Sequence, residues 1–139
     1  MKTVRLLFSD DMARAVVQGR KTVTRRPVMP FRIGDGVDAA RIDGRTAYLG
    51  NEDDGDIFVM PLPCAPGDIL IGRESVSFIA HGPEYGCRAR YRADGVERVF
   101  DPAPSEDTKY RPVDGWKCMP SIHMPDWAAR IRRRVVSVT

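Results

Sequence analysis

The sequence predicts a single α+β domain, spanning residues 1–139, that is built mainly from short strands. A chain of 139 residues is long enough to bury roughly two-thirds of its unfolded surface in one hydrophobic core. Eleven prolines and twelve glycines indicate many turns, which favours strands over a helical bundle. A helical pattern is clear over residues 9–19 and returns only briefly near 125–130.

Composition and charge narrow the class of protein. The chain is 42% hydrophobic and 29% charged with a net charge of +3, which is typical of a soluble globular domain and not of a disordered or fibrous chain. The cysteines, Cys64, Cys87 and Cys118, are too far apart for a readable disulfide framework or zinc site. We therefore expect free thiols, no metal or other cofactor, and a cytoplasmic protein without membrane contact.

The first strand and helix have clear local signals. The apolar run at 4–8 predicts a buried opening strand, and Ser9 then has the character of a helix N-cap. Negative charge in the first turn suits the helix dipole, and Gly19 ends the helix. The apolar face is predicted from the pairs Met12/Val16 and Ala13/Val17.

The rest of the chain predicts strands joined by turns. Residues 27–44 and 101–112 carry no clear pattern and are interpreted as irregular connections. The acidic run at 50–56 lacks the closing glutamate of a calcium-binding loop, so it is interpreted as a solvated hairpin connection. The strands are predicted at 45–49, 57–60, 69–76, 87–93, 96–100 and 131–138, with a hairpin turn at 93–95 and with Pro125 in the first turn of a short helix.

One predicted strand alternates in charge. Residues 87–93 place Arg88, Arg90 and Arg92 on one face and apolar side chains on the other. Like charges two residues apart on a strand lie about 7 Å from each other and repel one another. Two readings stay open: the carboxylates of Glu84, Asp94 and Glu97 balance the arginines, or the face binds a polyanion.

The most cationic segment follows the first helix. Residues 19–26 contain the hydroxyls of Thr22 and Thr24 and four cations, Arg20, Lys21, Arg25 and Arg26. Cations at a helix C-terminus can satisfy its last carbonyls, which is the structural explanation. The functional explanation is an anionic partner, since mutual repulsion needs a counter-charge and also favours the neutral lysine that a general base requires.

Four segments together resemble the ASCH domain, a relative of the PUA domain, as found in small proteins of bacteria and their prophages. The segments are 19–26 with its Gly-Arg-Lys-Thr-x-Thr pattern, 66–74 with Pro-Gly-Asp and Arg-Glu, 91–95 and 120–131. The resemblance covers nearly the whole chain. It implies a PUA-like twisted β-barrel with short helices at the rim, a basic cleft, and single-stranded RNA or a modified nucleoside as the partner.

The resemblance also implies candidate catalytic residues. One ASCH branch, the bacterial acetylcytidine amidohydrolases, shares the 19–24 pattern, which nominates Lys21 as general base and Thr24 as nucleophile. Glu74 is the substitute candidate for that branch's glutamate, which lies on a later helix not found here. Other ASCH proteins are ribonucleases, so the resemblance leaves an amidohydrolase, a ribonuclease and a non-catalytic domain open.

Binding residues follow from the same predicted cleft. Cations would contact phosphates and Trp116 would stack on a base, whereas Trp127 is expected in the core. His123 is interpreted as an anchor of its own turn or, alternatively, as a ligand contact. The predicted binding residues are Arg20, Arg25, Arg26, Arg73, Trp116, Ser121 and His123. A prophage-encoded interaction protein without any ligand is the remaining alternative.

Overall fold

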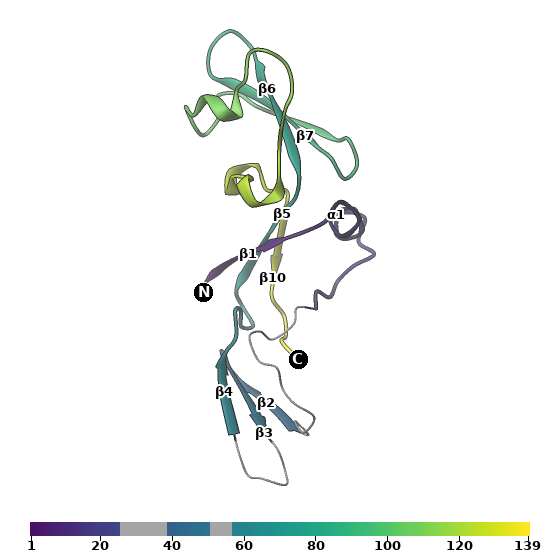
Figure 1. Cartoon of the computed structure of the whole chain (residues 1–139), viewed down its shortest axis with the longest axis vertical. Helices are drawn as coiled ribbons and strands as arrows, with labels where there is room; N and C mark the ends of the chain where they lie inside the picture. The colour runs from purple at the N-terminus through teal and green to yellow at the C-terminus, as the bar shows by residue number, and fades with distance from the viewer. Residues whose placement is uncertain (26–38, 51–56) are drawn as a thin grey trace. The chain divides into compact units, whose positions relative to one another are not determined.

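The computed structural model describes residues 1–25, 39–50 and 57–139 (Figure 1). These residues form one α-helix, three 3₁₀ turns and short strands, as the α+β prediction requires, and no closed barrel is present among them. No helix in these ranges is long and apolar enough to cross a bilayer. The elements are β1 (Thr3–Leu7), α1 (Asp10–Val17), β2 (Ala39–Asp43), β3 (Thr46–Gly50), β4 (Ile57–Pro61), β5 (Ile69–Arg73), β6 (Val76–His81), β7 (Gly86–Tyr91), β8 (Glu97–Phe100), η1 (Thr108–Tyr110), β9 (Lys117–Met119), η2 (Ser121–His123), η3 (Asp126–Ala128) and β10 (Ile131–Arg134).

The strands form three sheets. Their orders are β1-β5-β10, β2-β3-β4 and β8-β7-β6-β9. The chain also divides into two compact units, of which the first contains residues 1–4, 23–70 and 133–139, and the second contains residues 5–22 and 71–132. The single domain over 1–139 therefore stays a prediction, and each unit is described by itself.

In the first unit, the buried carboxylate of Asp68 joins three segments. It accepts hydrogen bonds from the backbone N–H of Lys2 (2.8 Å) and of Ala65 (2.9 Å), and it forms an ion pair with Arg45. Gly67 precedes it with φ of +92°, a backbone angle that favours glycine. The Pro-Gly-Asp turn thus places an acceptor where otherwise orphaned N–H groups converge.

The sheet β2-β3-β4 is a meander with an antiparallel register. Ala47 pairs with Met60 in β4, and Leu49 with Phe58. The buried side chains of Ala47, Leu49 and Met60 form its small core. The strands predicted at 45–49 and 57–60 are confirmed, but the loop predicted over 27–44 is wrong at its end, because residues 39–43 pair with β3. The acidic run at 51–56 lies outside the described residues.

In the second unit, helix α1 begins and ends as predicted. The Ser9 hydroxyl accepts a hydrogen bond from the N–H of Met12 (3.3 Å), and Gly19 follows the helix with φ of +73°. The buried face is narrower than expected. Ala13 and Val16 are buried, whereas Val17 is 41% exposed.

The four-stranded sheet β8-β7-β6-β9 confirms the alternation of the arginine-rich strand. Cys87, Ala89 and Tyr91 are fully buried, whereas Arg88 and Arg90 lie on the opposite face. The turn at 93–95 is also confirmed, since the N–H of Gly95 donates to the carbonyl of Tyr91 (2.8 Å).

Two strand boundaries differ from the prediction. The strand predicted over 69–76 ends at Arg73, and a separate strand, β6, begins at Val76. The strand pattern is interrupted at residues 74–75, where Glu74 is buried and forms an ion pair with Arg130. The alternation of β6, with Val76 and Phe78 buried, was missed. The last strand covers Ile131–Arg134 and ends before the valines that were predicted to continue it.

Aromatic rings close the core of the second unit. Trp127 is half-buried and packs against Phe78, Phe100 and Tyr110, with ring centroids 4.9–5.7 Å apart. Edge-to-face contacts of this kind add about 0.5–1.5 kcal/mol beyond the buried area. The expected core role of Trp127 is therefore confirmed.

The lowered pKa of Asp68 predicts how the stability of the fold depends on pH. The hydrogen bond from Arg45 lowers the pKa of Asp68 to about 2; burial opposes this, and the N–H groups of Ala65 and Lys2 add to it. A lowered pKa contributes stability above the ordinary value of about 4, and that contribution is lost as pH falls toward the folded value. The free energy of unfolding of the wild type, measured in urea, should fall as the pH decreases across this window. The free energy of unfolding of Asp68→Asn should be lower at neutral pH and should fall less steeply. Asp43→Asn, which removes an exposed carboxylate, is the control. An identical decline in wild type and Asp68→Asn would refute the role of this carboxylate.

Candidate functional site

A buried ion pair lies at the centre of the second unit. Glu74, which follows β5, is fully buried, and both of its carboxylate oxygens accept from Arg130: Nε donates to Oε2 at 2.9 Å and Nη2 to Oε1 at 2.8 Å. This bidentate arrangement is the strong form of an arginine–carboxylate contact. The N–H of Glu74 also lies 3.2 Å from the sulfur of Met124, which ties β5 to the 120–131 segment.

Arg130 has further partners in the 91–95 segment. Its Nη1 donates to Oδ2 of Asp94 at 2.6 Å, and its guanidinium carbon lies 4.2 Å from the centre of the Tyr91 ring. The Tyr91 hydroxyl in turn donates to the carbonyl of Ala128 (2.6 Å). Burial is the largest single influence on the pKa of Asp94 and acts to raise it, but the hydrogen bonds from Arg130 and from the N–H of Val96, together with the charge of Arg130, lower the pKa on balance. Burial raises the pKa of Tyr91, so this network holds one cation between two carboxylates.

A second polar cluster forms beside η2 and η3. Asp126 accepts from Arg5 (2.8 Å) and from Arg73 (3.1 Å), and the hydrogen bond from Arg5 is the main cause of its lowered pKa. Arg73 also donates to the carbonyl of Ile122 (3.3 Å). Its Nε is buried and lacks a hydrogen-bond partner in the described ranges.

Next to these clusters lies a cavity of about 330 Å³, which we call the serine pocket. Three of its side chains are hydroxyls, from Ser9, Ser75 and Ser121, and the others supply one carboxylate, one guanidinium and two apolar surfaces. The complete lining is Leu7, Phe8, Ser9, Asp10, Ser75, Arg92 and Ser121. Its residues come from the β1–α1 junction, the β5–β6 break, the end of β7 and η2, so four separate segments build it.

The charges in the serine pocket balance each other. The Nε of Arg92 lies 2.9 Å from Oδ2 of Asp10, and Asp10 stands in the first turn of α1, where the helix dipole favours a carboxylate. The backbone N–H of Arg92 donates to the carbonyl of Ser75 (3.1 Å), which holds two lining segments together. The pocket therefore presents hydrogen-bond donors and acceptors without a large net charge.

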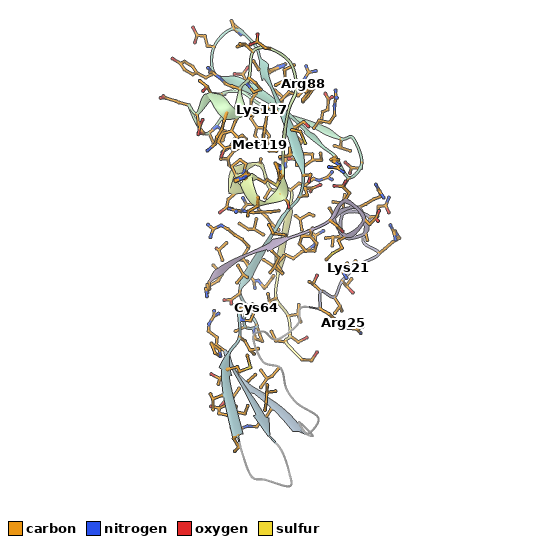
Figure 2. All side chains as sticks on the ribbon, in the orientation of Figure 1. Lys21, Arg25, Cys64, Arg88, Lys117 and Met119 are labelled. Carbon is orange, nitrogen blue, oxygen red and sulfur yellow. The ribbon has the colours of Figure 1, made fainter. Side chains whose placement is uncertain are left out.

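Residues 19–22 of the predicted basic segment, which belong to the second unit, do not line this cavity. The backbone N–H groups of Arg20 and Lys21 donate to the carbonyl of Ala15 at 2.9 and 3.0 Å, which completes the helix end. Lys21 is half-buried just after α1 (Figure 2). Thr24 is half-buried and Arg25 is exposed, but both belong to the first unit whereas Lys21 belongs to the second. Arg26 lies outside the described residues.

Other predicted site residues fall into different surroundings. Glu74 is sealed in the ion pair with Arg130, Arg73 is bound to Asp126, and Ser121 lines the serine pocket. His123 is exposed, and its ring has no hydrogen-bond partner within the described part of the chain. Trp116 is half-buried and lines a different cavity.

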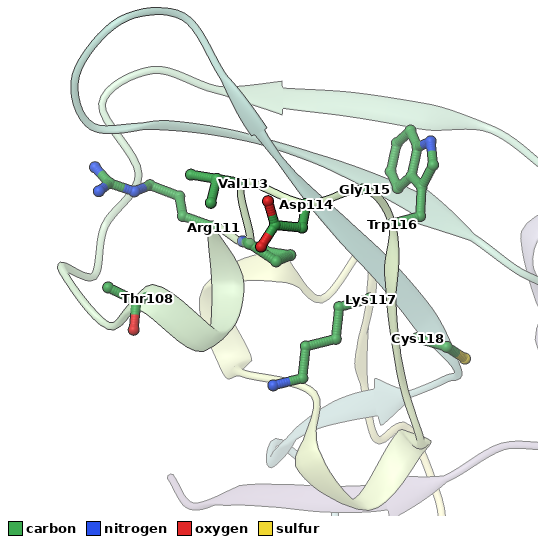
Figure 3. A pocket seen from close by; sticks show the side chains of 9 residues that line it. Thr108, Arg111, Val113, Asp114, Gly115, Trp116, Lys117 and Cys118 are labelled. Atoms are coloured by element: carbon green, nitrogen blue, oxygen red, sulfur yellow. The ribbon is translucent and has the colours of Figure 1, made fainter.

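This second cavity, of about 580 Å³, is bordered by the loop after η1 and by β9 (Figure 3). Figure 3 shows Trp116 and Cys118 projecting to one side of β9 and Lys117 to the other, as alternation along a strand requires. Thr108, Arg111, Val113 and Asp114 complete most of the wall.

Sequence reasoning missed several residues that build the site. Arg130 lies in the 120–131 segment that resembles the ASCH family, but no role was predicted for it. Arg92 was predicted only as part of a charged strand face. Ser9 was interpreted as a cap alone. Arg130 could have been predicted from Glu74, which stands at the end of an apolar strand. A carboxylate that is buried there needs a cationic or hydrogen-bonding partner.

The described residues offer no cluster of three or more histidine, cysteine, aspartate or glutamate side chains that could hold a metal ion. The thiols of Cys64, Cys87 and Cys118 are free, and burial raises the pKa of Cys87. The chemistry of the serine pocket therefore rests on hydroxyl, carboxylate and guanidinium groups.

The buried ion pair generates a stability prediction. Arg130→Met should destabilise the fold by about 3–5 kcal/mol, because it leaves the Glu74 carboxylate buried without a partner. The double variant Arg130→Met/Glu74→Leu should recover most of this loss in urea unfolding. Arg92→Met breaks a more exposed pair and should cost less than about 1 kcal/mol. A double variant as unstable as Arg130→Met would show that the cost lies outside the pair.

Comparison with known proteins does not assign the site to a family. No protein-family model, no curated protein and no solved structure matches the chain. The resemblance to the ASCH family therefore stays a prediction, and the function has to be inferred from the residues themselves.

Proposed function

We propose that this chain is an ASCH-type, PUA-like domain of the cytoplasm that binds a nucleoside, either modified and free or within single-stranded RNA. The observation that carries the proposal is the serine pocket, where three hydroxyls, the Asp10 carboxylate and the Arg92 guanidinium line a cavity of about 330 Å³. Small-molecule sites are typically concavities of about 300–1,000 Å³ with a few polar groups that orient the ligand.

The lining suits the functional groups of a nucleoside. Arg92 can donate to a base carbonyl, and Asp10 can accept from an amino group or from ribose hydroxyls. The serine hydroxyls can both donate and accept, and Leu7, which is 46% exposed, offers an apolar surface to a base. Because Arg92 is already paired with Asp10, recognition by hydrogen-bond pattern is favoured over capture of a bare anion.

The surroundings of the pocket support a preformed site. Ser75 directly follows Glu74, whose carboxylate is held by Arg130, and Ser121 lies in the segment that supplies Met124 to the same network. The backbone segments that carry these serines are therefore tied to the network, and a preformed site loses less conformational entropy when a ligand binds.

Binding without hydrolysis is the form of the proposal that the geometry favours. Both oxygens of Glu74 accept from Arg130 and the side chain is fully buried, so no oxygen is free to orient a lysine or a leaving amine. Lys21, which belongs to the same unit, does not line the serine pocket. An amidohydrolase mechanism would need Lys21, Thr24 and Glu74 together at the substrate.

Ligand binding tests the proposal. Titration calorimetry with cytidine, acetylcytidine and the other ribonucleosides should detect binding to at least one of them. Ser75→Ala and Ser121→Ala should each weaken it by about two- to tenfold, the cost of one lost hydrogen bond, and Arg92→Gln should weaken it at least as much. Ser105→Ala, which removes a hydroxyl outside the pocket, should leave affinity unchanged. Binding that is insensitive to all three pocket variants would refute the proposed site.

A turnover assay tests the absence of hydrolysis. Incubation of the wild type with acetylcytidine and with short RNAs, followed by chromatography, should show no product beyond the level of a protein-free control. The same result is expected with Lys21→Ala. Turnover that is present in the wild type and lost in both Lys21→Ala and Thr24→Ala would establish the hydrolase instead.

A further inference from the structure

The outer face of the four-stranded sheet carries a group of side chains that the serine pocket does not use. Opposite the buried residues of β7, Arg88 pairs across the sheet with Ile79 and Val99, and Arg90 pairs with Ser77 and Glu97. We call the surface formed by Arg88, Arg90 and Trp116 the arginine–tryptophan face. Figure 2 places Arg88 on this sheet in the second unit.

An aromatic ring and a cation are stacked on this face. The guanidinium carbon of Arg90 lies 4.0 Å from the centre of the Trp116 ring. Trp116 also borders the cavity of about 580 Å³, so part of its surface faces an open space (Figure 3). A half-buried tryptophan held by an arginine is a preorganised stacking surface.

The face carries more positive than negative charge. Arg88 and Arg90 share the single carboxylate of Glu97, at 3.5 Å and 2.7 Å. The side chains of these arginines remain 40% and 45% exposed. The only other polar partner of Arg88 within the described residues is Nδ1 of His81 (3.3 Å), which adds no negative charge. One guanidinium therefore lacks a full counter-charge.

We infer that the arginine–tryptophan face binds nucleotides of a single-stranded RNA that flank the one held in the serine pocket. Trp116 stacks on a base, and Arg88 and Arg90 contact phosphates. This inference rests on the proposed function and narrows it, because the physiological ligand becomes a polynucleotide and not a free nucleoside.

The chemistry of the face favours a single strand. Stacking on Trp116 needs an unpaired base whose ring surface is accessible, which a double helix does not offer. Proteins that bind single strands without sequence preference combine a cationic surface with aromatic platforms of this kind. The apolar side chains of the face, Ile79 and Val99, lie directly opposite Arg88, so they do not form a continuous apolar patch for a protein partner.

The test compares a labelled single-stranded RNA of about ten nucleotides with the best-binding ribonucleoside. Trp116→Leu should weaken RNA binding by roughly five- to hundredfold, the range found for loss of one stacked base. Arg88→Gln/Arg90→Gln should reduce the slope of log affinity against log salt by about 1.4, since each phosphate contact to a single strand contributes about 0.7. Arg90→Lys should retain the slope because the charge remains.

Two controls isolate the face. Arg41→Gln removes another arginine stacked on an aromatic ring, 4.8 Å from the centre of Tyr48 in the first unit, and should not change the salt slope. Nucleoside affinity should be equal in wild type and in every face variant. Thermal unfolding followed by circular dichroism checks that Trp116→Leu is folded.

The outcomes separate this inference from the proposed function. If the nucleoside binds but RNA affinity and salt slope match the wild type in all face variants, the inference is overturned and the proposed function stands. If RNA binding depends on the face while no nucleoside binds the serine pocket, the RNA-binding role of the face is supported, but the pocket assignment and the flanking arrangement are overturned. RNA binding that is weakened equally by Arg41→Gln would reduce the effect to net charge and overturn the inference.

Discussion

The second unit depends on one buried ion pair between Glu74 and Arg130. Desolvating two charges is expensive, and the cost is offset only where every oxygen and N–H finds a partner. Here both oxygens of Glu74 are used by Arg130, and the remaining guanidinium nitrogen is used by Asp94. The pair therefore explains why β5 stops at Arg73 and why the 91–95 and 120–131 segments come together beside it.

The serine pocket is a consequence of this network. Ser75 directly follows Glu74, whose carboxylate is bound by Arg130, and Ser121 precedes Met124, whose sulfur accepts from the N–H of Glu74. The Arg92–Asp10 pair then connects the end of β7 to the start of α1. The serine pocket thus combines buried-network neighbours with a partly exposed ion pair, Arg92–Asp10, in its lining.

Two carboxylates of the second unit each serve two arginines. Asp126 pairs with Arg5 and Arg73, and Glu97 pairs with Arg88 and Arg90. The clusters differ in their other contacts, since Arg73 also donates to the carbonyl of Ile122 whereas Arg90 is stacked on Trp116. Net charge alone would not have identified either cluster, since it sums over all charged groups alike.

Local elements were determined by the sequence itself, because their signals lie within a few residues: the Ser9 cap, the alternation over 87–93 and the turn at 93–95 all follow from spacing. The sequence did not predict the partner of Glu74, the separate strand β6 or the four-segment serine pocket. These depend on residues up to 114 positions apart, as Leu7 and Ser121 are. Only the tertiary structure decides such long-range pairs, because a carboxylate, a guanidinium or a hydroxyl has the same local pattern whether it ends in solvent, in an ion pair or in a cavity.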